Sequence, residues 1–317
     1  MSLETSFDIK NIICSYFDYL KDTLNLYNLN KDHQNNIKII NLYDIPKKYM
    51  NKLNQQIIEQ DKYKYVEKLD AYNNYKIWNV NHMKKTLKIL NCGYGCGINQ
   101  KGISQLNLIE LYANGNKKIK NVNHMKKTLK ILNCCDESGI DQTGISELNL
   151  GELNAYNNNK ITNVNHMNNT LKRLECGNNS GIDQDGIANL NLIELDVADN
   201  KKIKYVNHMK KTLKILYCGY DSGIDQSGIS ELNLIKLSAT GNEKIENVNH
   251  MKNTLKILNC KFNSGINQNG ISELNLIELY TTGNEKIKNT NHMENTRSFI
   301  NSYNAKFYKN LFNIDFL

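Results

Sequence analysis

The sequence predicts an α/β solenoid whose inner side is one continuous parallel β-sheet. Two observations predict this fold. A leucine recurs at one fixed interval without insertion or deletion, at Leu87, Leu108, Leu129, Leu150, Leu171, Leu192, Leu213, Leu234, Leu255 and Leu276. The 21-residue coils alternate between two types, so the full super-repeat is 42 residues long. A short, exact period indicates one unit stacked many times, because a single unit is too small to bury its own apolar face.

Each coil is predicted to contain one short strand. In the coil that begins at Leu87, the pattern LxxLxLxxNxxI places Leu90 and Cys92 two residues apart, on the buried face of a strand. The twelfth position is isoleucine in all eleven coils between Val66 and about Thr296, and we expect each isoleucine to pack on its own copies. This pattern resembles the leucine-rich repeat, which implies a short strand that turns into a loop.

The remainder of each coil is predicted to be short turns or 3₁₀ pieces. About ten residues must cross the outer side of a coil, and no long helical period fits them. Glycines recur at two corners of alternate coils, first at Gly97 and Gly102, where the chain must bend or approach a neighbour closely.

Three columns of repeated residues are predicted to be structural. Asparagines in the ninth position of alternate coils are expected to bond buried backbone groups, and they are Asn74, Asn116, Asn158, Asn200, Asn242 and Asn284. Histidines of the NHM motifs and cysteines of the sixth position also recur at intervals of 42 residues. Copies two coils apart lie about 9.6 Å from each other, which is too far for one zinc ion or for a disulfide.

No catalytic residue, metal site or cofactor is predicted. No nucleophile, base and oxyanion donors are arranged together in the sequence, so we expect a protein that is not an enzyme. The predicted target-binding surface is instead formed by the outward positions of the inner sheet, which mix isoleucine, acidic residues and tyrosine as protein interfaces do. The candidates are Ile89, Glu110, Tyr112, Ile131, Glu152, Glu194, Ile215, Tyr217, Glu278 and Tyr280. The alternation of isoleucine with charged residues would also arise from the two coil types alone, without any binding. The sequence therefore does not decide which face of the coils binds a target.

The first 45 residues follow a different pattern, which predicts two or three short helices. The segment DIKNIICSYFDYLKDTLNLYNLNKDHQNN resembles an F-box, and with the repeats the chain resembles the F-box and leucine-rich-repeat proteins of giant DNA viruses of the mimivirus group. The resemblance implies a substrate receptor that links a target protein to the Skp-type adaptor of a cullin-RING ubiquitin ligase. The adaptor-docking residues would be Ile9, Ile12, Ile13, Phe17 and Leu20. A helical lid on the first coil shows the same apolar spacing, and the chain would then be an interaction scaffold with no ubiquitin connection.

The predicted segments are an F-box-like module in 1–45, a connector or N-terminal cap in 46–65, repeats in 66–296, and a degenerate repeat with a C-terminal cap in 297–317. In the last segment Arg297 stands where the first leucine is expected.

The net charge of +8 and the lysine pairs beside the NHM motifs leave nucleic-acid binding as a third and less favoured alternative. No stretch is long and apolar enough for a membrane, and the N-terminus lacks the pattern of a signal peptide, so we expect an intracellular, cytoplasmic protein, in the host cytoplasm if the chain is viral. The target and the oligomeric state are not predicted.

Overall fold

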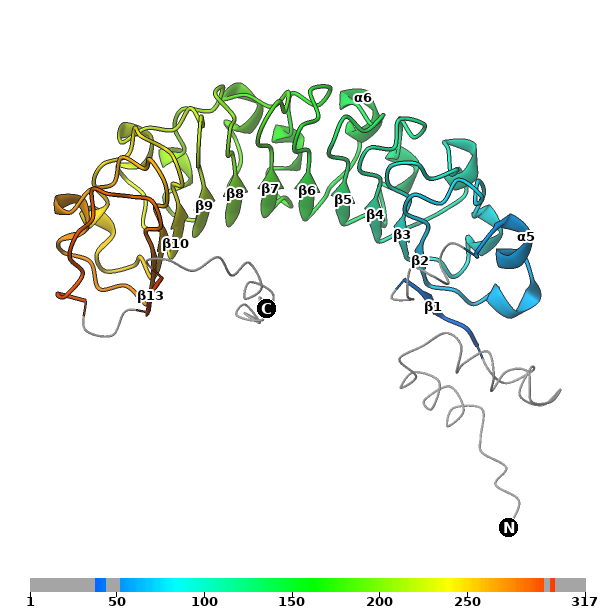
Figure 1. Cartoon of the computed structure of the whole chain (residues 1–317). Helices are drawn as coiled ribbons and strands as arrows, with labels where there is room; N and C mark the ends of the chain where they lie inside the picture. The colour runs from blue at the N-terminus through cyan, green and yellow to red at the C-terminus, as the bar shows by residue number, and fades with distance from the viewer. Residues whose placement is uncertain (1–37, 44–51, 294–296, 300–317) are drawn as a thin grey trace, which may run out of the picture. The chain divides into compact units, whose positions relative to one another are not determined.

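The computed structural model describes residues 38–43, 52–293 and 297–299, the last three by their backbone alone. The chain divides into two compact units, Met1–Asn191 and Leu192–Leu317, called unit 1 and unit 2. Within each unit the strands lie side by side along one side of the coils, and the turns lie on the other side (Figure 1). The predicted adaptor-docking residues 9–20 and nearly all of the predicted C-terminal cap lie outside the described residues.

Unit 1 contains a parallel sheet in which each step along the chain adds one neighbouring strand. Its strands are β1 (Asn41–Leu42), β2 (Lys68–Asp70), β3 (Ile89–Asn91), β4 (Glu110–Tyr112), β5 (Ile131–Asn133), β6 (Glu152–Asn154) and β7 (Arg173–Glu175). Leu69, Leu90 and Leu111 are successive partners in this sheet. The predicted stacking of equivalent positions is therefore confirmed, and Leu42 of β1 extends the row by pairing with Leu69.

Unit 2 repeats the same parallel arrangement. Its strands are β8 (Glu194–Asp196), β9 (Ile215–Tyr217), β10 (Lys236–Ser238), β11 (Ile257–Asn259), β12 (Glu278–Tyr280) and β13 (Arg297–Phe299). At β13 the predicted register is wrong, because Arg297 pairs with Glu278 in the third position of a coil and does not occupy the first. The step along the chain from Glu278 to Arg297 is shorter than the step from Ile257 to Glu278, so the chain reaches the last strand early.

The return segments are short turns and single helical turns, as predicted. In unit 1 they include α5 (Gln55–Ile58), η1 (Asp61–Tyr63), η2 (Asn81–Met83), η3 (Lys101–Ile103), η4 (Asn123–Met125), α6 (Gln142–Ile145), η5 (Asn165–Met167) and η6 (Asp185–Ile187). In unit 2 they are η7 (Asn207–Met209), η8 (Ser227–Ile229), η9 (Asn249–Met251) and η10 (Asn269–Ile271). Every NHM motif from Asn81 to Met251 forms such a 3₁₀ turn, whose methionine is buried and whose histidine is exposed.

The asparagine and histidine columns are structural, as predicted. The side-chain amide of Asn158 donates to the carbonyl oxygens of Cys134 and Ile140 at 2.8 and 3.0 Å, and its oxygen accepts from the Lys160 N–H. The Nε2 atom of His166 lies 3.2 Å from the carbonyl oxygen of Ile145, one coil back. Both columns therefore satisfy backbone groups between coils, which explains their regular recurrence.

The sixth-position cysteines form part of the core. Cys92, Cys134, Cys176, Cys218 and Cys260 are all 0% exposed and carry free thiols. Burial raises the pKa of the Cys134 and Cys260 thiols to about 12. A buried thiol held protonated is a poor nucleophile and a poor metal ligand, so these cysteines act as small apolar side chains.

Replacing Asp141 by alanine is expected to lower the free energy of unfolding by about 1 kcal/mol at neutral pH, because Asp141 caps α6. Its carboxylate accepts from the Thr143 hydroxyl at 2.7 Å and from the Gly144 N–H at 2.9 Å. These bonds, the Thr143 bond foremost, hold the pKa of Asp141 below its ordinary value. A depressed folded-state pKa means that the stabilisation is present above about pH 4 and is lost as the pH falls through the folded-state pKa.

The measurement is urea unfolding of wild type and variant at neutral and acidic pH. Asp141→Asn is the matched control, because Asn99 and Asn267 bond the equivalent glycine N–H groups of their own coils. The asparagine variant should keep most of the stability and lose this pH dependence. An equal pH dependence in wild type and Asp141→Asn would contradict the assignment.

Candidate target-binding surface

The outward positions of the strands form the inner face of each unit. In unit 1 the third-position column is Lys68, Ile89, Glu110, Ile131, Glu152 and Arg173, in register from β2 to β7. The fifth-position column is Asp70, Asn91, Tyr112, Asn133, Asn154 and Glu175 in the same register. All of these side chains are partly or fully exposed, whereas the leucines between the two columns are buried. The alternating pleat of the strands produces this division.

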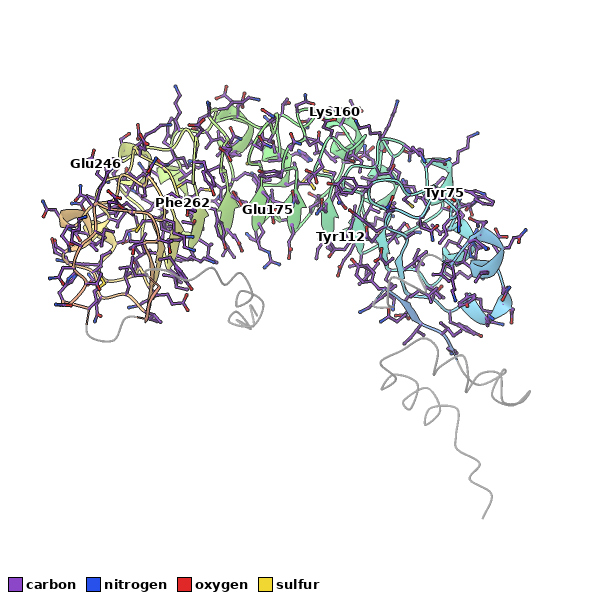
Figure 2. The ribbon with its side chains drawn as sticks, viewed as in Figure 1. Tyr75, Tyr112, Lys160, Glu175, Glu246 and Phe262 are labelled. Carbon is purple, nitrogen blue, oxygen red and sulfur yellow. The ribbon has the colours of Figure 1, made fainter. Side chains whose placement is uncertain are left out.

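Side chains on the inner face of unit 1 are held by one another. The Tyr112 hydroxyl donates to the Glu110 carboxylate at 2.9 Å, and the Tyr112 ring lies 6.4 Å from the Tyr43 ring. Burial and the bond to Glu110 raise the pKa of Tyr112 above its ordinary value. Glu152 and Arg173, on neighbouring strands, form an ion pair. Tyr112 and Glu175 lie on the strand side of unit 1, and Lys160 lies on the loop side (Figure 2).

The inner face of unit 2 is organised around a lysine. Lys236 lies between Ile215 and Ile257 in the third-position column and is only 7% exposed. Its ammonium donates to the Tyr217 hydroxyl at 2.9 Å and lies 4.9 Å from the centre of the Tyr217 ring. Burial lowers the pKa of Lys236, and the Glu194 and Glu278 carboxylates act in the opposite direction. Lys236 is therefore a largely buried basic group on the inner face, with two carboxylates near enough to act on it.

A second tyrosine–carboxylate pair lies in β12. The Tyr280 hydroxyl donates to the Glu278 carboxylate at 2.8 Å, which repeats the Tyr112–Glu110 pair of unit 1. The Lys261 ammonium lies 5.2 Å from the centre of the Tyr280 ring. Neighbouring side chains therefore orient the Tyr112 ring in unit 1 and the Tyr280 ring in unit 2.

All ten predicted target-binding residues lie on inner-face strands. Ile89, Glu110, Tyr112, Ile131 and Glu152 lie on consecutive strands of unit 1. In unit 2, Glu194 pairs with Ile215 next to Tyr217, and Glu278 and Tyr280 lie three strands further on, in β12. The sequence-based prediction of the target-binding surface did not include Lys236 or Arg173. Each of them interrupts the alternation of isoleucine and glutamate in the third position, and this interruption could have identified them.

The lysine pairs beside the NHM motifs are partly neutralised. The first lysine of each of three pairs contacts a residue of the following coil: Lys84 bonds Gln105 at 2.7 Å, Lys126 pairs with Glu147, and Lys210 pairs with Glu231 at 2.5 Å. These contacts are exposed and contribute little to stability. The two contacts with glutamate cancel part of the positive charge that phosphate groups require, and this weighs against nucleic acid as the ligand.

Within the described ranges, no three His, Cys, Asp or Glu side chains are grouped so that they could hold a metal ion. Over the same residues, none of the helices has the length and apolar character needed to cross a bilayer.

Comparisons with known proteins give two structural likenesses. No family model matches the chain, and no curated protein matches it. An internalin from Listeria monocytogenes is similar with a TM-score of 0.47 and 17% identity, over 78% of this chain and 89% of that chain. The crystal structure of the Rad7 and Elc1 complex in yeast contains a chain that is similar with a TM-score of 0.44 and 15% identity, over 93% of this chain and 91% of that chain. Similarity at this level says nothing about what this chain binds.

Proposed function

We propose that this protein is a protein-binding scaffold whose inner face holds a target protein. The observation that carries the proposal is the inner face itself, where partly exposed isoleucines alternate with charged groups and oriented tyrosines on a backbone of parallel strands. Tyrosine and arginine are enriched where binding energy concentrates, and charged groups beside them supply specificity. Side chains already held by hydrogen bonds lose less freedom on binding, which favours affinity.

The burial of Lys236 supports the same proposal. Removing an ammonium group from water is unfavourable, and an apolar side chain of similar size would be at least as stable in its place. Ile215 and Ile257 on either side show that the column accepts apolar residues. A basic group retained at a position where the fold accepts isoleucine is explained if that position contributes to target binding.

The inner face is tested by changing one charge on each side of unit 2. Glu278→Lys alters the inner face, and Glu246→Lys makes the same change at an exposed residue of the return segment. Wild type and Glu246→Lys should capture the same protein from a cell lysate, and Glu278→Lys should capture at least about tenfold less of it. This result would identify the target and would assign its binding to the inner face. Equal recovery by both variants would contradict binding through the inner face.

Lys236→Met is expected to leave the free energy of unfolding within about 1 kcal/mol of wild type, or to raise it, because the burial penalty is removed. The same variant should bind the target about tenfold more weakly. Urea unfolding and recovery of the target measure the two effects on the same preparation. A loss of several kcal/mol without any loss of binding would instead assign Lys236 to the fold.

We further propose that the scaffold is a substrate receptor that docks on a Skp-type adaptor through Ile9, Ile12, Ile13, Phe17 and Leu20. The support is the apolar spacing of these residues and the resemblance of the N-terminal segment to an F-box. Binding of purified Skp-type adaptor, abolished by Ile13→Asp with the repeats still folded by circular dichroism, is the expected result. A wild-type chain that does not bind the adaptor would leave the simpler scaffold, with the N-terminal segment as a lid.

A further inference from the structure

In unit 2 two exposed aromatic residues alternate with two glycines just beyond the carboxyl ends of the strands, and we call this row the aromatic rim. The rim consists of Tyr220, Gly241, Phe262 and Gly283, each in the eighth position of its coil. Each residue follows the end of its strand by three positions, so the rim lies beyond the inner face. Tyr220 is 51% exposed and Phe262 is 48% exposed, although both could have been replaced by polar residues without loss of core packing.

The rim residues have an unusual backbone conformation. Tyr220 and Phe262 adopt φ of 53° and 57°, in the left-handed region that bulky side chains avoid. The same position elsewhere holds Asn73, Asn157 and Asn178, which tolerate this conformation because their short polar side chains bond locally. The aromatic side chains therefore do not stabilise this backbone conformation as asparagine does. Strain retained at an exposed position points to a function.

The glycines of the rim accompany the aromatic residues. In this chain Tyr94, Tyr220 and Phe262 are each followed one coil later by glycine at the same position, whereas Asp136 is followed by Asn157. A Cβ atom at Gly241 would lie 3.2 Å from the Tyr220 ring, and one at Gly283 would lie 3.4 Å from the Phe262 ring. Each ring therefore rests against the glycine of the next coil.

Unit 1 shows how far such a ring reaches. The Tyr94 ring lies against Gly115, and its hydroxyl donates to the Asp136 carboxylate, two coils on, at 2.8 Å. Phe262 stands in the place of that acid in unit 2, so Tyr220 is followed along the rim by a second aromatic residue. The rim of unit 2 thus differs from unit 1 in being an apolar strip.

Backbone hydrogen bonds fix the spacing of the rim. The N–H groups of Tyr220, Gly241 and Phe262 donate to the carbonyl oxygens of Thr240, Lys261 and Thr282 at 2.6, 3.0 and 2.8 Å. The parallel ladder therefore continues to the rim and holds neighbouring coils about 4.8 Å apart, so Tyr220 and Phe262 are about 9.6 Å apart along the stack. A polyproline II helix has three residues per turn and rises about 9.3 Å per turn.

We propose that the aromatic rim binds an extended, proline-rich segment in the polyproline II conformation. Prolines three residues apart would lie on Tyr220 and Phe262, and the glycines between them leave room for the intervening residues. Aromatic surfaces recognise such segments because the polyproline II helix is already ordered before it binds. This site lies outside the inner face and goes beyond the proposed function.

Charge indicates a further feature of the segment. Glu243 and Glu285 follow the two rim glycines by two residues, are exposed, and form no ion pair with the described residues. The nearby Lys244 ammonium is engaged by the Ser222 carbonyl oxygen at 2.7 Å, and Lys261 lies over the Tyr280 ring. The two free carboxylates complement a lysine or arginine, so the segment carries a basic residue next to its prolines.

The test is the binding of a labelled peptide with prolines three residues apart and a terminal arginine, followed by fluorescence anisotropy on the full chain. Wild type should bind this peptide at least about tenfold more tightly than a peptide with alanine in place of proline. Tyr220→Asn with Phe262→Asn should lose this preference, about tenfold or more. The fold should survive, because asparagine already occupies the same position in other coils.

Tyr94→Asn is the matched control, since Tyr94 is bonded to Asp136, and it should bind the peptide as wild type does. Gly241→Asn is a second variant, which keeps a residue that tolerates positive φ and displaces the Tyr220 ring. It should weaken binding about tenfold. Equal binding of the proline and alanine peptides, no binding by wild type, or full binding by the double variant would each overturn the proposal. The inner-face proposal is tested separately: if the rim proposal fails but capture of the target still depends on Glu278, the inner-face proposal remains supported.

Discussion

Replacing Gly144 by alanine is expected to destabilise unit 1 by about 3 kcal/mol, although alanine ordinarily stabilises a helix relative to glycine. Gly144 lies in α6, where the chain approaches the preceding coil. A Cβ atom there would lie 2.0 Å from the Lys120 carbonyl oxygen and 3.1 Å from the Asn121 Cα atom. Both contacts are with backbone, which cannot move aside without breaking the hydrogen bond from Val122 to Gly144. Steric overlap therefore exceeds the gain in helix propensity.

Gly151→Ala provides the control for this prediction. A Cβ atom at Gly151 would meet only the Lys130 carbonyl oxygen, at the ordinary contact distance of 3.7 Å. Urea unfolding followed by circular dichroism should show a large loss for Gly144→Ala and a change within about 0.5 kcal/mol for Gly151→Ala. Equal stabilities of the two variants would mean that the coils do not approach as closely at α6 as described.

Replacing Asn158 by alanine is expected to cost about 3 kcal/mol. The side chain is 0% exposed, and its removal leaves the carbonyl oxygens of Cys134 and Ile140 and the N–H of Lys160 without their partner. A buried polar group left unsatisfied costs about 1 to 3 kcal/mol, and entry of water would recover part of that loss. The expected value is therefore less than the sum of three such losses.

Asn169→Ala is the comparison for Asn158→Ala, because Asn169 is exposed and no side-chain hydrogen bond is found for it within the described residues. Its effect on the free energy of unfolding should be within about 0.5 kcal/mol. Thermal and urea unfolding of the two variants measure the difference. If Asn158→Ala were as stable as Asn169→Ala, the asparagine column would not be the structural element that its hydrogen bonds indicate.

The stack could be predicted from the sequence because a repeat of fixed length determines which residues become neighbours. Leu90 and Leu111 must lie side by side once every coil has the same length, and the buried and exposed positions follow from the pleat. β1 could not be predicted in this way. Asn41 and Leu42 precede their partners Lys68 and Leu69 by more than the length of one coil, so no repeat relates the two strands.

The candidate site was predictable in its positions and not in its contacts. Register alone places Glu110 and Ile131 on the inner face, but the bonds of Tyr112 to Glu110 and of Lys236 to Tyr217 depend on side-chain conformation. The aromatic rim could not be predicted from the sequence for another reason. The sequence shows that the eighth position differs from coil to coil, but it does not show that the position has positive φ, where an aromatic side chain is unusual.

The stacking of equivalent positions is tested most directly by a distance between spin labels at residues 68 and 152, introduced as noncanonical amino acids so that the native cysteines remain. These positions lie in β2 and β6, four strand steps apart in one sheet. Four steps of about 4.8 Å predict a single narrow distribution near roughly 19 Å between the two backbones, widened by the label arms. A broad distribution, or one centred far above this value, would show that the coils do not stack and would contradict every inference about the inner face.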